Sequence, residues 1–234
     1  MYLAKVNYKK DNVVQILSDT LKDIIDENTV IVCIGTDRAI GDSLGPLVGT
    51  MLKNSNYKYP VYGTLDKPIH ALNIYESLQS IKKKHVNGNF LAIDACLGSK
   101  SNIGNLQVRK GPILPGKGVG KKLPEIGNYS IVGIVDKVDE NNKFSFNSIR
   151  LSFILDMAEI IALSLILSTW FQYIPLYSKI KKLSKDSFFI FELMQTLILR
   201  YKLILHQHMR LHWPYLYFFL KKSFQLPFLM YLPV

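Results

Sequence analysis

Two aspartates lie in segments where a parallel β-sheet commonly binds ligands. Asp42 belongs to the polar stretch 36–43, which follows an apolar run ending at Gly35, and Asp94 interrupts the apolar segment 90–97. If both apolar runs form neighbouring strands, their carboxyl ends open onto one crevice and the two carboxylates meet there. Two close carboxylates cannot both ionise easily, so one retains a proton while the other acts as a base. Such a pair would activate water for attack on an amide carbonyl.

Each of these acids also has a structural interpretation, which the sequence leaves open. Asp42 could cap the helix expected to begin near Leu44, because Asp is a favoured N-cap residue. Asp94 could instead bind loop amides. Asp37, beside Arg38, fits a solvated pair of opposite charges, but its place in the same loop also makes it a candidate substrate-binding residue.

Three further residues are candidates for substrate binding. His70 lies between a predicted strand and a predicted helix, where it could donate a hydrogen bond at the edge of the site. Lys117 and Lys121 belong to a glycine-rich basic loop, 116–122, that could cover a cleft or bind an acidic group; a solvated loop is the alternative. The preceding segment 111–117 matches only the first part of a phosphate-binding loop, so we expect no nucleotide cofactor.

The remaining metal-ligand residue types do not form a convincing cluster. His206, His208 and His212 have no nearby Cys or carboxylate to complete a metal site, so no metal is expected. Cys33 and Cys96 both lie in apolar runs and are expected to be buried structural thiols.

The composition limits the class of protein. The chain has 234 residues, of which 48% are hydrophobic, and only two cysteines. These values exclude a disordered chain and a disulfide-rich scaffold, and they suggest a reducing compartment. The first thirty residues mix Lys, Asp and Asn, so we expect no signal peptide and a cytoplasmic location.

The positive charge is concentrated near the C-terminus. The net charge is +11, and residues 168–234 alone hold nine Lys and Arg against two Asp and Glu. The excess therefore gives no reason to expect a nucleic-acid partner for residues 1–167. For the tail, 168–234, three interpretations stay open: a membrane-associated extension, for which the uncharged run 160–178 is long enough, a helical appendage, and a non-native extension such as a frameshift product.

Residues 1–167 alternate between strand and helix patterns. Short β-branched apolar runs are typical of buried parallel strands, and apolar residues at helical spacing indicate covering helices. This order predicts a three-layer α/β/α domain with a mostly parallel sheet. The predicted helices are 12–25, 44–52, 72–84 and 147–167, and the predicted strands are 29–35, 60–64, 89–97, 106–110 and 129–135.

Five segments in order resemble the YyaC-type sporulation proteins, a family described as spore proteases. They are GTDRAIGDSLGPLVG, YGTLDKPIHALN, FLAIDACLG, PGKGVGKKLPEIG and SIVGIVD. The resemblance covers about residues 10–167. It is more distant to the germination protease that degrades small acid-soluble spore proteins and to the hydrogenase maturation endopeptidases.

The resemblance implies a phosphorylase/hydrolase-like fold and a catalytic aspartate pair at Asp42 and Asp94. It also implies a cytoplasmic peptidase of the forespore or spore interior, with a protein or peptide substrate such as a spore protein. The hydrogenase maturation enzymes bind nickel with help from a later histidine, but no histidine lies between His85 and His206, so we expect no cofactor. The alternative function is a non-catalytic regulatory protein that binds a peptide or partner. Membrane contact is expected only through the tail, and the oligomeric state is left open.

Overall fold

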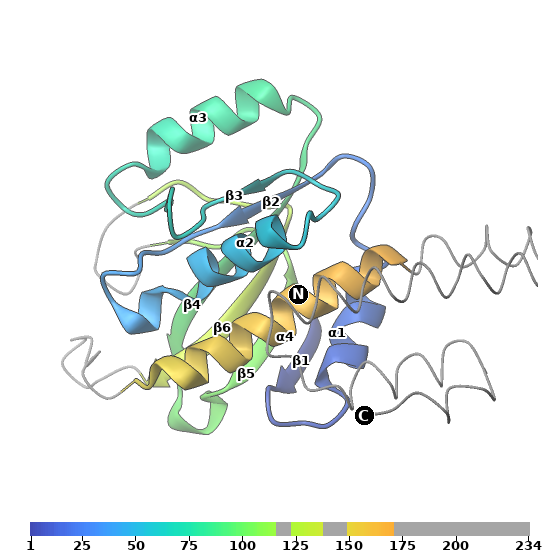
Figure 1. Cartoon of the computed structure of the whole chain (residues 1–234), viewed down its shortest axis with the longest axis vertical. Coiled ribbons are helices and arrows are strands. Elements are labelled where there is room, and N and C mark those ends of the chain that lie inside the picture. The colour runs from blue at the N-terminus through green and yellow to red at the C-terminus, as the bar shows by residue number, and fades with distance from the viewer. Residues whose placement is uncertain (116–122, 138–148, 171–234) are drawn as a thin grey trace, which may run out of the picture. The chain divides into compact units, whose positions relative to one another are not determined.

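A six-stranded mixed sheet forms the centre of the protein in a computed structural model that describes residues 1–115, 123–137 and 149–170. The strand order is β1-β5-β6-β4-β2-β3, and three of the five pairings are parallel (Figure 1). The expected α/β class with a largely parallel sheet is confirmed. The strands are β1 (Tyr2–Asn7), β2 (Thr29–Cys33), β3 (Val61–Tyr62), β4 (Asn89–Gly98), β5 (Asn105–Lys110) and β6 (Tyr129–Lys137).

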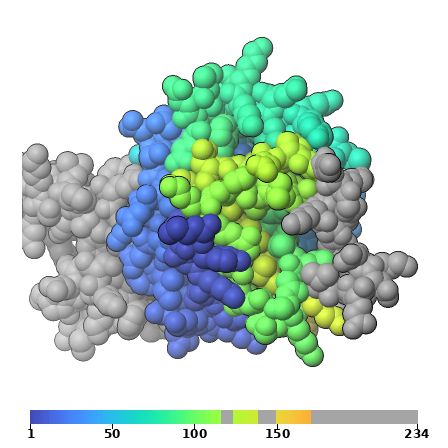
Figure 2. All heavy atoms as spheres, turned by 180° about the vertical axis from the view of Figure 1, so that it is seen from behind, coloured from blue at the N-terminus to red at the C-terminus, as the bar shows by residue number. Residues whose placement is uncertain are grey.

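The edge strand β1 is the one strand that the sequence pattern did not predict. Of its residues only Val6 is buried, whereas Tyr2 and Leu3 are exposed, so no clear alternation marks it. The strand is held by antiparallel pairing with β5, about a hundred residues later in the chain. Figure 2 shows these N-terminal residues, in dark blue, at the molecular surface.

Helices cover both faces of the sheet. The helices are α1 (Val13–Leu21), α2 (Leu44–Asn54), α3 (Ile74–Lys84) and α4 (Leu151–Trp170). The helix α4 packs against both α1 and α2, whereas α3 lies apart from these three (Figure 1). The helix predicted for 12–25 is shorter than expected, because Lys22 is its C-cap and the buried Ile24 and Ile25 lie in the turn that follows.

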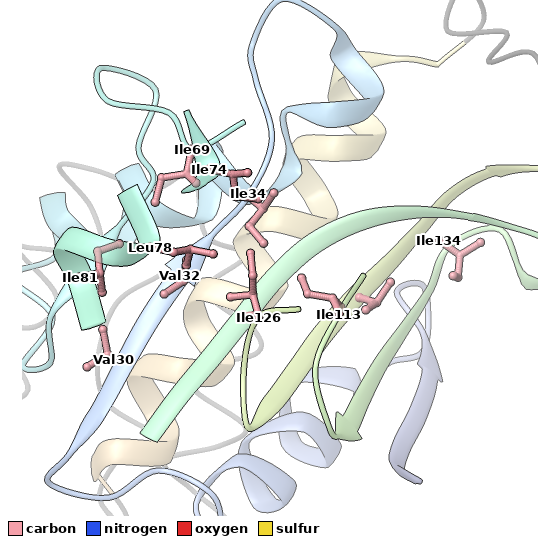
Figure 3. Packing of buried hydrophobic residues seen from close by; sticks show 12 residues of the cluster. Val30, Val32, Ile34, Ile69, Ile74, Leu78, Ile81, Ile113, Ile126 and Ile134 are labelled. Carbon is pink, nitrogen blue, oxygen red and sulfur yellow. The ribbon is translucent and has the colours of Figure 1, made fainter. Parts of the chain in front are cut away.

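Successive side chains of β2 point to opposite faces of the sheet and therefore toward different helices. Val30, Val32 and Ile34 pack with Ile74 and Leu78 of α3 in one buried cluster (Figure 3). Cys33 points the other way, since a Cβ added to Gly49 of α2 would contact its Sγ. The sheet is therefore covered by α3 on one face and by α2, with α1 and α4, on the other.

The helix α4 is long and apolar enough to cross a membrane by length and composition alone. However, Ile154, Met157 and Ile161 are fully buried. Such burial is expected for the core helix of a folded domain, which can be equally long and apolar. Residues 171–234, which make up most of the tail 168–234, lie outside the described residues.

Three glycines allow the backbone of α2 to lie directly on the strands. A Cβ at Gly45 would overlap the carbonyl oxygen of Ile34, and one at Gly49 would overlap that of Gly63. Gly63 itself has a positive φ of 83° and lies against the carbonyl of Cys33. The first turns of α2 are thereby fixed over the end of β2.

Substituting Gly49 with Ala should destabilise the protein. In a helix, Ala is normally better than Gly by about 1 kcal/mol, but here the added methyl group meets backbone and has no flexible neighbour to displace. We expect a net loss of roughly 1–3 kcal/mol of unfolding free energy, measured by urea denaturation of the full chain. The control is Lys53→Ala, at an exposed position of the same helix, which should change stability little. A Gly49→Ala protein as stable as the wild type would contradict this packing.

Candidate active site

The candidate site lies at the end of β2, which has the next strand of the chain, β3, on one side and the following strand, β4, on the other. The chain passes from β2 through α2 to β3 and then returns through α3, on the opposite face, to β4 on the other side of β2. The loop that follows β2 therefore leads to the face covered by α2, and the loop that follows β3 leads to the face covered by α3. In open parallel sheets a crevice at the carboxyl ends of such strands is the usual place for a ligand.

At this edge β2 leaves the sheet before β4 does. Their last register pair is Cys33 with Ile93, and the Ile34 amide donates one further bond of 2.8 Å to the carbonyl of Ile93. At Gly35, with a φ of +134°, the chain turns away and its amide donates to the carbonyl of Ile69. The strand β4 continues to Gly98.

Asp42 ends a short 3-10 helix, η1 (Ile40–Asp42), that lies over the end of β2 and packs against β4 and α4. Its carbonyl accepts a 3.0 Å bond from the amide of Thr36, which closes the loop. The N-cap position of α2 is occupied by Ser43, whose hydroxyl donates to the carbonyl of Ile40. The interpretation of Asp42 as the N-cap of this helix is therefore wrong, and its carboxylate is available for another role.

Asp94 is the first residue of β4 beyond the last pair with β2. It lies on the same strand face as Ala92, which belongs to the buried cluster under α3. One of its carboxylate oxygens accepts a 2.8 Å bond from the amide of Ala95. The residue is half-buried, so the carboxyl group is held among protein atoms but retains some exposed surface.

Burial disfavours ionisation of both acids, and the charge of Asp42 further disfavours ionisation of Asp94. Burial raises the pKa of Asp42 to about 6, although the Thr36 amide opposes this shift. The pKa of Asp94 is raised well above its usual value, first by burial and then by the nearby charge of Asp42, while the Ala95 amide again opposes the shift. The carboxyls are thus near enough to interact, and an ionised Asp42 disfavours the ionisation of Asp94.

Of the four other predicted site residues, the structure describes His70 and Asp37. His70 follows Ile69, which forms a bridge with Ile34 at the end of β2, so it lies at the same edge of the sheet. Its Nδ1 accepts a bond from the amide of Leu72, which leaves Nε2 as the protonated nitrogen of the neutral ring. Asp37 is exposed in the loop before η1. Lys117 and Lys121 lie outside the described residues.

One expectation about the cysteines is wrong. Cys33 is fully buried as predicted, but Cys96 is exposed, because it lies in the part of β4 that extends beyond the end of β2.

The sequence did not identify every group near the two acids. No sequence pattern marked the backbone amides of Thr36 and Ala95 that bind near them. Within the described ranges, no three His, Cys, Asp or Glu side chains are grouped closely enough to hold a metal ion.

One hollow among the described residues lies elsewhere. It has a volume of about 770 Å³ at the amino ends of the parallel strands, and its lining includes Met1, Asp19, Lys110 and Tyr129. None of the predicted site residues lines it. The acid pair at the opposite edge is the stronger candidate, because carboxyl groups with strongly raised pKa values are typical of functional sites.

Together these features define a three-layer α/β protein with two coupled carboxyl groups at the carboxyl edge of its sheet. The family described as "Protein of unknown function (DUF1256)" matches residues 5–164, and the chain belongs to this family. A similar protein is "Uncharacterized protein YyaC" of Bacillus subtilis (strain 168), 44% identical over 148 residues, which cover 63% of this chain and 72% of that protein.

Replacing Asp42 with Asn should stabilise the protein above about pH 6. The folded-state pKa of Asp42 is raised, so below pH 3.8 folding has no ionisation cost, and stability falls as the pH rises from there through about 6. The asparagine side chain never ionises and avoids this loss, which amounts to roughly 1–3 kcal/mol at about 1.4 kcal/mol per pKa unit. Urea unfolding of the full chain at pH 4 and pH 8 measures the difference.

The matched control for this comparison is Asp11→Asn, at an exposed position just before α1. It should shift stability equally little at both pH values. An Asp42→Asn protein that gains no stability between pH 4 and pH 8 would show that this carboxyl group is not destabilised in the folded state.

Proposed function

We propose that the protein is a peptidase in which Asp42 and Asp94 hydrolyse a peptide bond. The single observation that carries this proposal is the interaction of the two carboxyls: the pKa of Asp42 is raised to about 6, and the pKa of Asp94 is raised well above its usual value by burial and by the charge of Asp42. A general acid beside a general base is the arrangement that attack of water on an amide carbonyl requires.

In the proposed reaction, Asp42 begins ionised and acts as the base, and Asp94 begins protonated and acts as the acid. The Asp42 carboxylate takes a proton from water as the water oxygen bonds to the carbonyl carbon, and Asp94 gives its proton to the carbonyl oxygen. In the tetrahedral intermediate the nitrogen then accepts the proton held by Asp42, and the C–N bond breaks. The hydroxyl proton returns to Asp94 as the new carboxyl group forms, so the pair ends with one proton.

The resemblance to spore proteases supports a substrate class and a location. The substrate would be a protein or peptide of the developing spore, cleaved in the cytoplasm of the forespore or in the spore interior. His70 and Asp37 lie in loops at the same edge of the sheet and would bind the substrate on either side of the acid pair. No metal or other cofactor has a part in this mechanism.

Loss of either carboxyl group should abolish cleavage. We expect peptide release by Asp42→Asn and Asp94→Asn proteins to fall at least 10²-fold, because acid–base assistance contributes about 10²–10⁴-fold. The full chain is incubated with an extract of spore proteins, and released peptides are identified by mass spectrometry. Asp11→Asn is the control and should cleave at the wild-type rate.

Two results would contradict the proposal. Equal cleavage by the wild-type and both Asn proteins would place any catalytic group elsewhere. Capture of a spore protein without its cleavage, by a wild-type chain shown to be folded, would instead support the alternative of a non-catalytic binding protein.

A further inference from the structure

The strand β4 has a free edge directly beside the acid pair. In the described chain no strand pairs with β4 on the β2 side after Ile93, although β4 continues to Gly98. On its other side β4 remains paired with β6 up to Gly98. The last residues of β4 are therefore a stable strand with one side open.

The direction of the backbone groups follows from alternation. Ile93 directs its carbonyl to β2, where it accepts the Ile34 amide, so Ala95 and Leu97 direct their amides and carbonyls to the same side. The register shift after Cys96 adds a residue to β6, not to β4, and leaves this alternation intact. Two alternate β4 residues, Ala95 and Leu97, thus direct main-chain groups to the β2 side of the strand.

Asp94 and Cys96 already engage two of these groups. The Ala95 amide donates to a carboxylate oxygen of Asp94, and the Cys96 thiol donates to the carbonyl of Leu97. Among the described residues, the Ala95 carbonyl and the Leu97 amide have no partner on the open side, and both residues are only half-buried. An acceptor and a donor two residues apart match the pattern that one residue of a paired extended strand requires.

From this geometry we propose that the free edge of β4 at Ala95 and Leu97 binds the substrate as an added strand, through its main chain. The substrate is then an unfolded or locally extended polypeptide, because a helix or a closed fold has no free main-chain groups to offer. This inference rests on the proposed function, and it explains how a scissile carbonyl would be placed beside Asp94.

Exposed apolar side chains near this edge indicate the type of sequence preferred. Ile40, in η1 next to Asp42, is 40% exposed, and Leu72, in the loop after His70, is 81% exposed. Both lie at the carboxyl edge of the sheet. An extended chain with apolar side chains flanking the bound residue would bury them.

The test uses the full-length Asp94→Asn protein, which binds without cutting and keeps the acceptor for the Ala95 amide. The probe is reduced and carboxymethylated α-lactalbumin, a chain that stays unfolded in water, and folded α-lactalbumin is the control. Hydrogen exchange at the Leu97 amide should slow when the unfolded probe binds and not with the folded one. Ile93, already within the paired part of β4, should change little.

A variant pair separates the main chain from the side chain. Leu97→Pro removes the amide on the open side and should weaken binding of the unfolded probe roughly five- to tenfold, the value of about one hydrogen bond. Leu97→Ala keeps the amide and should bind within about twofold of the parent, because the side chain has no part in main-chain pairing. If Leu97→Pro fails to fold, the exchange experiment alone decides.

The outcomes distinguish this inference from the proposed function. Slowed exchange at Leu97 without cleavage by the wild-type chain would support strand addition and contradict the peptidase. Aspartate-dependent cleavage with unchanged exchange at Leu97, or equal binding by the Pro and Ala variants, would overturn strand addition and leave the peptidase intact. Absence of probe binding would also overturn it, because main-chain recognition should tolerate most sequences.

Discussion

The site depends on the close approach of two backbones, the first turns of α2 and the end of β2. Gly45 and Gly49 have no Cβ to hold the helix away from Ile34 and Gly63. Because the helix cannot move outward or rotate without losing this contact, η1 and Asp42 are fixed over the end of β2. Gly35 completes the arrangement, since its positive φ turns the chain out of the sheet directly after β2 and Ile34.

The departure of β2 from the sheet has three consequences at the end of β4. It uncovers the β2 side of β4, leaves the Ala95 amide to be satisfied by Asp94, and exposes Cys96. The rest of the sheet supplies the rigidity, since β4 stays paired with β6 over its whole length beyond Asp94. Two acids with raised pKa values are a cost to stability, and this well-packed domain can support that cost at a functional site.

The sequence was sufficient to predict the parts of the fold that depend on local pattern. The buried strands near Ile31 and Ile93 are short apolar runs, and the helix around Leu78 has clear periodicity. The edge strand at Tyr2–Asn7 was not predictable in this way, because a distant partner stabilises it and it buries little. Asp42 and Asp94 could be paired in advance because carboxyl ends of parallel strands converge. The exposure of Cys96 and the open backbone of Leu97 depend on where β2 ends, which no local pattern marks.

Asp42 and Asp94 interact at the end of the sheet, and both resist ionisation at the pH where a free aspartate ionises. The most direct test is the pH dependence of the side-chain carboxyl ¹³C resonances of both residues in the full chain, with and without the Asp42→Asn substitution. We expect Asp42 to titrate near pH 6, Asp94 to titrate well above its usual range, and removal of the Asp42 charge to lower the pKa of Asp94. Independent titration of both groups near pH 4, unchanged by the substitution, would contradict this interaction.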